Sequence, residues 1–205
     1  PGVWTSGSFH DGFDTDRAIF FRIGVFEEVA YGYLDTPVRD LDWWQLREVD
    51  SGEEFRVFVL HLKASQGEEP ARLEEATILR NFMLTLPGDL PIVVAGDFNI
   101  YTWTEPAYQL LISASAAQLI DPINRPGNWH DNASFADIHT QSTRTIAFGG
   151  GATGGMDDRF DQILVTSEFM DATGPEIVPS TYTAVGNDGL HFNMSIIEGG
   201  NTAVP

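Results

Sequence analysis

Short apolar runs of the kind that form β-strands recur along this chain of 205 residues. Residues 18–23 and 25–34 are rich in Phe, Ile, Val and Tyr, and they predict two strands paired with each other after a loop over residues 1–16. Residues 43–49 and 54–63 predict a hairpin, because the turn-forming sequence Asp-Ser-Gly separates them. The second strand of this hairpin is apolar on both faces, which predicts burial on most of both sides.

Two stretches have the apolar spacing of helices. Residues 68–86 place Leu, Ala, Phe and Met at helical intervals, with Pro70 in the first turn and a Pro-Gly pair after the last turn. Residues 105–118 predict a second helix, with Thr104 as its N-cap and Pro106 just inside it.

The second half of the chain alternates apolar runs with polar loops. Strands are predicted over residues 91–95, 144–148, 160–166 and after a turn within 182–197, with a long loop over 121–142 and a glycine-rich loop over 149–155. Strands outnumber helices, and several are apolar on both faces. We therefore expect one domain of the α/β class (α+β in some schemes), with two packed sheets and helices outside them.

The apolar run 91–95 leads directly into Gly96-Asp97-Phe98-Asn99. In an extended exit from the strand, Asp97 and Asn99 would point the same way while Phe98 packs inward, which suits the binding of a metal, a water or a phosphate. An Asx turn after a strand explains the same residues equally well, because Gly, Asp and Asn are common turn formers.

Two other candidate residues, His61 and Asp161, lie at the ends of predicted strands. Polar groups at the ends of buried strands commonly form the site of an α/β protein. A buried carboxylate needs a partner, and a histidine held by a carboxylate recurs in catalysis. Taken singly, however, His61 also fits a hydrogen-bonded histidine at the core edge, and Asp161 fits an acid that opens a strand.

Composition narrows the choice of partners. The formal net charge of -19 gives no general attraction to nucleic acid or anionic lipid, so an anionic substrate would need a local positive site such as a bound metal. The chain has no cysteine, which excludes disulfides and thiolate metal sites. The sequence contains no apolar run of about 18 residues, so no membrane span is predicted.

Three motifs then occur in order: His61-Leu62-Lys63, Val-Val-Ala-Gly-Asp-Phe-Asn ending at Asn99, and Arg-Phe-Asp-Gln-Ile-Leu-Val beginning at Arg159. In this order and strand context they resemble the endonuclease/exonuclease/phosphatase family, the deoxyribonuclease-I-like enzymes, over about residues 17–166. The resemblance implies a four-layer sandwich of two mixed β-sheets flanked by helices. It also implies hydrolysis of a phosphate ester with a divalent metal, Mg²⁺ or else Mn²⁺ or Ca²⁺.

The resemblance implies a role for each matched residue. Asp97 would orient and deprotonate the attacking water, Asn99 would position that water and a phosphate oxygen, and both would belong to the metal site. His61 would contact the scissile phosphate, and Asp161 would complete the polar network.

Three arginines have weaker assignments. Arg39 matches a place where relatives keep an arginine near the substrate, although a solvated surface charge explains it equally well. Arg144 follows the long loop and is a second candidate for phosphate binding. Arg159 is either a surface charge or a support for the same site.

The chain departs from the family pattern at both ends. Relatives begin with a strand carrying Asn and a helix carrying a metal-binding Glu, and nothing before Arg17 supplies these two elements. We therefore expect the domain 1–205 to be incomplete and the isolated fragment to be weakly active. Relatives end with Ser-Asp-His, whereas here Leu190 stands where the acid should precede His191. Either His191 is the catalytic histidine of a variant motif, or the Asp-His pair lies beyond Pro205.

The leading interpretation is a metal-dependent phosphodiesterase or endonuclease with DNA or RNA as candidate substrates. The alternatives are a phosphomonoesterase or sphingomyelinase acting on inositol or lipid phosphates, and a non-catalytic binding module with a decayed site. Only 11 Lys and Arg residues are present, which argues against extended contact with long DNA. We expect a monomer in a secreted or periplasmic location.

Overall fold

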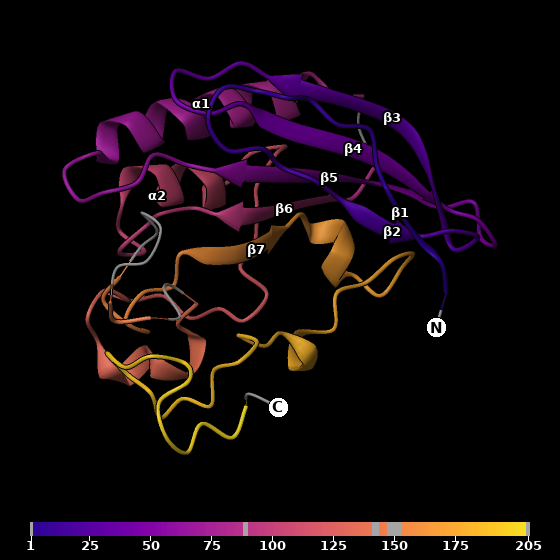
Figure 1. Ribbon diagram of the computed structural model, residues 1–205. Helices are drawn as coiled ribbons and strands as arrows, with labels where there is room; N and C mark the ends of the chain where they lie inside the picture. The colour runs from indigo at the N-terminus through magenta and orange to yellow at the C-terminus, as the bar shows by residue number, and fades with distance from the viewer. Residues whose placement is uncertain (1, 88–89, 141–143, 147–152, 204–205) are drawn as a thin grey trace.

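Five strands form the main sheet, in the spatial order β3-β4-β5-β6-β7 (Figure 1). The computed structural model describes residues 2–87, 90–140, 144–146 and 153–203. The strands are β3 (Phe26–Leu34), β4 (Leu41–Glu48), β5 (Glu54–His61), β6 (Ile92–Asp97) and β7 (Asp161–Val165). The sheet is mixed, because β6 runs parallel to β5 whereas the other neighbouring pairs are antiparallel.

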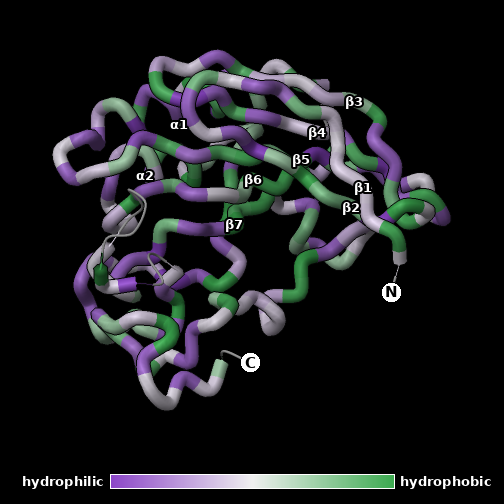
Figure 2. The backbone as a smooth tube through the Cα atoms, viewed as in Figure 1, coloured by the Kyte–Doolittle hydropathy of each residue, from purple (hydrophilic) through white to green (hydrophobic). Residues whose placement is uncertain are grey.

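The predicted hairpin is confirmed as β4 and β5, and both faces of β5 are covered. Phe58 and Leu60 belong to the main hydrophobic core, whereas Val57 and Val59 pack against a second cluster on the opposite face. Figure 2 shows the apolar stretches concentrated along these central strands. The alternation of side chains along an extended strand thus divides β5 between two layers.

A second sheet of two strands, β1 (Trp4–Ser6) and β2 (Phe20–Arg22), covers part of that opposite face. Phe21 packs there against Trp44 and Leu46 of β4. The prediction that the strands over 18–23 and 25–34 pair with each other is wrong, as is the prediction that residues 1–16 form only a loop. β2 pairs with β1, and β3 pairs with β4 over its whole length. The chain turns between β2 and β3 at Gly24, whose φ is 78°, and this turn directs the two strands into different sheets.

The two α-helices, α1 (Glu69–Thr85) and α2 (Pro106–Ile112), pack on the other side of the main sheet. Helix α1 confirms the predicted helix over 68–86. Helix α2 ends six residues before the predicted end at 118 and follows Glu105 rather than Thr104 as N-cap. Its early end has a local cause: the Arg80 guanidinium donates to the carbonyl oxygens of Leu110 and Ser113, which satisfies the last turn of the helix.

The chain after α2 is mostly irregular. It contains the short 3₁₀ helices η1 (Ala133–Ile138), η2 (Ser167–Met170) and η3 (Pro179–Thr181). The predicted long loop over 121–142 is confirmed apart from η1, with residues 141–143 outside the described part. Residues 144–146 do not form the predicted strand, and the rest of that strand and most of the glycine-rich loop lie outside the described residues.

The strand predicted within 182–197 is also absent from the described structure, where Phe192 forms only an isolated bridge with Met156. The layers therefore run from helices through the main sheet to the smaller sheet, so the predicted α/β sandwich of two sheets is confirmed. The described part of the chain shows three layers rather than four, and its smaller sheet is antiparallel rather than mixed. In the part of the chain that the structure describes, neither the length nor the apolar content of any helix suffices to cross a membrane.

Candidate functional site

The ends of β5 and β6 and the start of β7 meet at one edge of the main sheet. His61 is the Cα partner of Asp97 across the parallel pair β5–β6, and Asp97 is the partner of Asp161 across the antiparallel pair β6–β7. Partners on neighbouring strands place their side chains on the same face of a sheet. Three polar residues that are distant in sequence therefore stand in one row at this edge of the sheet.

Gly96 and Asn99 form a strained turn around Asp97. Gly96 has a φ of 132°, and a Cβ atom there would lie 2.1 Å from the carbonyl oxygen of Leu60, so only glycine fits. Asn99 has a φ of 50°, and its backbone N–H donates to Asp97 Oδ1 over 2.9 Å. The predicted extended exit is therefore wrong: an Asx turn and the candidate site are the same structure. Phe98 is fully buried, as expected.

The Asn99 side chain is itself buried, and its Nδ2 donates to the carbonyl oxygen of Leu62 over 3.0 Å. Arg39 donates to the same oxygen through Nη1 over 3.4 Å, and its Nε donates to Asp14 over 2.9 Å. Leu62 follows His61, so this shared carbonyl holds the amide and the guanidinium beside the row. Arg39 is thus placed at the site rather than on a distant surface.

The His61 ring is held on both sides. Its Nε2 lies 3.6 Å from Asp97 Oδ2, and its Nδ1 lies 3.1 Å from the hydroxyl of Thr15. Thr15 is fixed by Arg17, which donates to its carbonyl oxygen and forms a buried ion pair with Asp42. Burial lowers the pKa of His61, and the positive charge of Arg39 lowers that pKa further, so the ring is neutral near pH 7.

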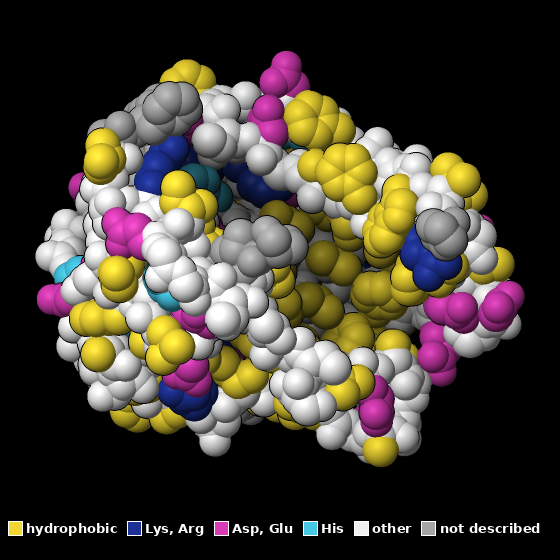
Figure 3. Space-filling view, turned by 60° about the horizontal axis from the view of Figure 1, so that its bottom comes forward, with side chains coloured by type: hydrophobic (Ala, Val, Ile, Leu, Met, Phe, Trp, Pro, Cys, Tyr) yellow, Lys and Arg dark blue, Asp and Glu magenta, His cyan; other side chains and the backbone are white. Residues whose placement is uncertain are grey.

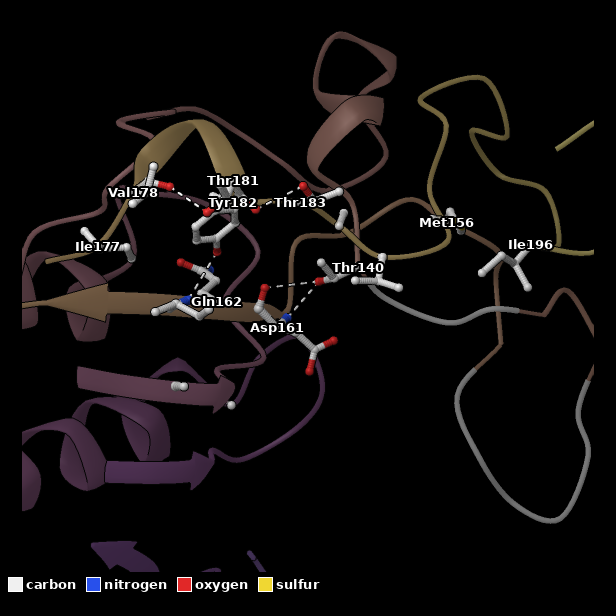
Figure 4. Close-up of a pocket in the computed structure, with 15 residues that line it drawn as sticks. Thr140, Met156, Asp161, Gln162, Ile177, Val178, Thr181, Tyr182, Thr183 and Ile196 are labelled. Carbon is white, nitrogen blue, oxygen red and sulfur yellow. Dashed lines mark hydrogen bonds between the residues drawn. The ribbon is translucent and has the colours of Figure 1, made fainter. Parts of the chain in front are cut away.

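Asp161 opens β7 and is exposed, which corrects the prediction of an acid buried within an apolar strand. The inward positions of β7 belong instead to Gln162 and Leu164, because side chains alternate along the strand. The hydroxyl of Thr140 accepts from the Asp161 N–H over 2.9 Å and donates to its carbonyl oxygen over 3.3 Å (Figure 4). This loop residue therefore fixes the start of the strand.

The two carboxyl groups of the row have raised pKa values. Partial burial of the Asp161 carboxyl group raises its pKa to about 6, with a further contribution from the negative charge of Asp97, although the residue as a whole is exposed. Burial also raises the pKa of Asp97, against the hydrogen bond from Asn99, which lowers it. Two adjacent carboxylates in a partly desolvated place favour a proton or a cation between them.

His191 lies in the C-terminal irregular segment and is buried. Its Nδ1 lies 2.8 Å from Asp188 Oδ1, and its Nε2 lies 3.0 Å from the carbonyl oxygen of Glu198. Both ring nitrogens thus have partners within the same segment. Its partner acid is three residues away in sequence, and the chain turns at Gly189 to bring the two together.

The remaining sequence candidates are two arginines. Arg144 is half-buried, and its backbone carbonyl oxygen accepts from the Gly155 N–H over 3.1 Å. Arg159 is fully buried and makes a two-pronged ion pair with Asp121, at 2.7 and 2.9 Å, so the surface-charge alternative is wrong and the residue supports the fold beside β7.

Sequence reasoning missed Thr15 and Thr140, the hydroxyl partners of His61 and Asp161. Both lie in irregular stretches whose residues carry no periodic signal. The only local hint was length, since a long loop within a compact domain is often functional.

A cavity of about 550 Å³ opens beside Asp161 over β6 and β7, on the face of the main sheet opposite the helices. Its lining includes Ala95, Ile163, Ile177 and Tyr182, and Asp161 lies at its edge. Figure 3 shows the hollow as a field of hydrophobic side chains, with basic side chains and a histidine near one end. Asp161, one member of the row of polar residues, therefore lines a largely apolar hollow.

Residues 7–181 match the family model described as the Endonuclease/Exonuclease/phosphatase family. This match covers most of the chain, and the chain therefore belongs to that family, as its three motifs predicted. Its members are in general hydrolases.

Individual relatives agree with this assignment. Nocturnin of Drosophila melanogaster is 36% identical over 107 residues, which are 49% of this chain and 16% of that protein. The human nocturnin catalytic domain with a bound sulfate anion superposes with a TM-score of 0.56 at 19% identity, over 79% of this chain and 60% of that one. TDP2 of D. rerio with a single-strand DNA product gives a TM-score of 0.55 at 18% identity, over 84% and 64%.

At these identities the two structures show the common fold alone. This chain spans less than two thirds of each of these three relatives.

Proposed function

We propose that this chain carries the central part of the active site of a divalent-metal-dependent phosphodiesterase. The observation that carries the proposal is the single row of partnered residues His61, Asp97 and Asp161. Each member is a group that phosphate-ester hydrolysis uses: a neutral imidazole, a carboxylate of raised pKa and a second carboxylate beside it.

The donor set fits a hard divalent cation such as Mg²⁺, with Mn²⁺ or Ca²⁺ as substitutes. Asp97 offers carboxylate oxygens, and Asn99 offers its amide oxygen, because its amide nitrogen is committed to Leu62. The crowding of Asp97 against Asp161, which raises the pKa of Asp161, is the kind of repulsion that a cation relieves. When bound, such a cation would offset the charge of the phosphate and make a bound water more acidic.

The side chains of this chain have separable tasks in the proposed reaction. Asp97 takes the proton from the attacking water, and its raised pKa makes it a better base than an ordinary aspartate. Neutral His61 donates from Nε2 to a phosphate oxygen in the tautomer in which its Nδ1 accepts from the Thr15 hydroxyl, which lies 3.1 Å away. Arg39, at the same edge, supplies a permanent positive charge.

The preference for a diester rests on the relatives. The sulfate in human nocturnin is a tetrahedral anion, and the TDP2 structure contains a DNA product. Recognition of a phosphate by one local site is also compatible with the net charge of -19, which disfavours long electrostatic contacts with nucleic acid.

The test is hydrolysis of bis-p-nitrophenyl phosphate, p-nitrophenyl phosphate and a single-stranded oligonucleotide, with Mg²⁺ or Mn²⁺. We expect the two diesters to be cleaved and Asp97→Ala to abolish cleavage. Asp171→Ala is the matched control, because Asp171 is an exposed aspartate beyond the opposite end of β7.

Each alternative function has its own outcome in this assay. Preference for the monoester would support a phosphomonoesterase instead. Absence of cleavage, with the oligonucleotide still bound, would support a binding module. Unchanged cleavage in Asp97→Ala would overturn the proposed role of the row.

A further inference from the structure

A second group of metal-ligating side chains lies outside the row described above. His130, Asp157 and Asp158 each place one potential ligand atom within 4.8 Å of the others. His130 comes from the loop after α2, whereas the two aspartates precede β7. The group therefore joins two segments that are distant in sequence.

The contacts within this group have the spacing of ligands around one ion. His130 Nδ1 lies 3.1 and 3.0 Å from the two carboxylate oxygens of Asp158. Ligand atoms that each lie about 2.1 Å from a zinc ion are themselves roughly 3 to 4 Å apart. The Asp158 side chain is only 4% exposed, so the carboxylate is held in place rather than free in solvent.

Asp157 supplies the second, independent observation. Its Oδ1 atom is buried and has no hydrogen-bond partner among the residues that the structure describes. A buried carboxylate oxygen without a partner is costly, and here the carboxylate of Asp158 lies within 4.8 Å while the negative charge of Asp131 acts on the same group. The charged neighbours described for Asp157 and Asp158 are His130, His139 and Asp131, with no lysine or arginine among them, so a divalent cation would supply a fixed positive charge beside these carboxylates.

The surroundings of His130 fit a ligand role. Tyr101 packs its ring edge-on against the imidazole at 5.1 Å, and the Gln66 amide lies 2.9 Å from Nε2. The Gln66 atom at this distance is the amide nitrogen, and with the amide turned so that its oxygen faces the ring, Gln66 would accept from Nε2–H as the partner of a ligating histidine does. The His130 side chain is 37% exposed, so water can complete the coordination from the open side.

We infer that His130, Asp157 and Asp158 form a binding site for a divalent transition-metal cation, Zn²⁺ or Mn²⁺, distinct from the row of His61, Asp97 and Asp161. One imidazole nitrogen and two carboxylate oxygens are the donor set that these ions accept.

The site has a structural consequence for that row. The carbonyl oxygen of Asp158 accepts from Thr140 N–H over 2.8 Å, and Thr140 in turn fixes the start of β7 at Asp161. The bound cation fastens the His130 loop to the segment that leads into Asp161.

The test is binding of Zn²⁺, Mn²⁺ and the coloured probe Co²⁺ to chelator-treated chain, by equilibrium dialysis and visible absorption. We expect His130→Ala and Asp158→Asn to weaken Zn²⁺ binding at least ten-fold. Zn²⁺ should raise the thermal unfolding midpoint of the unchanged chain but not of His130→Ala.

Two controls make the result specific. His10→Ala removes another partly exposed histidine that is bonded to one aspartate, Asp40, and should leave the affinity unchanged. Asp97→Ala should also retain this site, which separates the inference from the proposed catalytic function. Circular dichroism checks folding, and His130→Gln replaces His130→Ala if the latter unfolds. Wild-type affinity in a folded His130 variant, or no binding by the unchanged chain, would overturn the inference.

Discussion

Asp97 and Asp161 are direct partners on the antiparallel strands β6 and β7, so two carboxyl groups stand side by side at one edge of the main sheet. His61 continues the row on the other side of Asp97. Because each residue comes from a strand within one sheet, backbone hydrogen bonds and not loop conformation set the spacing of the row.

This row predicts unequal losses of activity on substitution. Asp97→Asn should lower kcat/KM for bis-p-nitrophenyl phosphate by about 10³-fold, because the amide can neither take a proton nor replace the carboxylate charge. Asp161→Asn should lower kcat/KM by less, about 10²-fold, because Asp161 supports Asp97 and does not itself take the proton. Steady-state kinetics check both values, and equal rates in Asp97→Asn and the unchanged chain would contradict the assignment.

Metal removal should abolish the same activity. A chelator in excess should stop cleavage, and Mg²⁺ or Mn²⁺ should restore it, because oxygen ligands such as Asp97 suit both ions. Added Mg²⁺ or Mn²⁺ should not restore cleavage in Asp97→Asn. It should restore cleavage in His130→Ala when its concentration saturates the proposed metal site at Asp97. Full cleavage in the presence of chelator would refute the metal requirement.

Gly96 should be intolerant of any side chain. An added Cβ would lie 2.1 Å from the Leu60 carbonyl oxygen at a φ of 132°, so Gly96→Ala should destabilise the chain by roughly 2–5 kcal/mol. Gly52→Ala is the matched control, since Gly52 also has a positive φ but no atom of the described residues lies within 4 Å of the added Cβ, and this substitution should destabilise the chain by about 1 kcal/mol. Urea unfolding measures both, and equal costs would contradict the steric argument.

The buried ion pair of Arg159 and Asp121 should matter far more than a similar pair at the surface. Arg159→Met leaves the Asp121 carboxylate buried without its partner and should cost about 3–5 kcal/mol. Arg125→Met breaks the exposed two-pronged pair with Asp137 and should cost about 1 kcal/mol or less. Denaturant unfolding of the two variants provides the comparison, and a small loss in Arg159→Met would show that the pair is not needed for the fold.

The pair of Asp188 and His191 predicts a pH dependence of stability. The hydrogen bond to His191 lowers the pKa of Asp188 from 3.8 to about 2, so its contribution is present above pH 3.8 and is lost as the pH falls toward 2. The same bond raises the pKa of His191 above 6.5, so that contribution is present below pH 6.5 and is lost as the pH rises through the raised value.

The two contributions overlap between pH 3.8 and 6.5. Asp188→Asn should therefore lower the free energy of unfolding most within this window, measured by denaturant unfolding at a series of pH values. A loss that does not vary with pH would show that the pair is not charged in the folded chain.

Local sequence determined the elements that carry the site. His61, Asp97 and Asp161 each adjoin an apolar run, and such a run predicts a strand and the position of its end without knowledge of its partners. The family motifs depend on the same local residues, which is why membership was visible in the sequence.

Only the tertiary structure decided what these residues meet. The pairing of β2 with β1, the hydroxyl contacts of Thr15 and Thr140, and the approach of His130 to Asp158 join positions far apart in the chain. Periodicity describes one segment at a time, whereas such contacts depend on how strands pair and how loops close over the sheet. The turn at Asp97 illustrates the difference: the residues predicted either a turn or a site, and the packing of β6 between β5 and β7 makes it both.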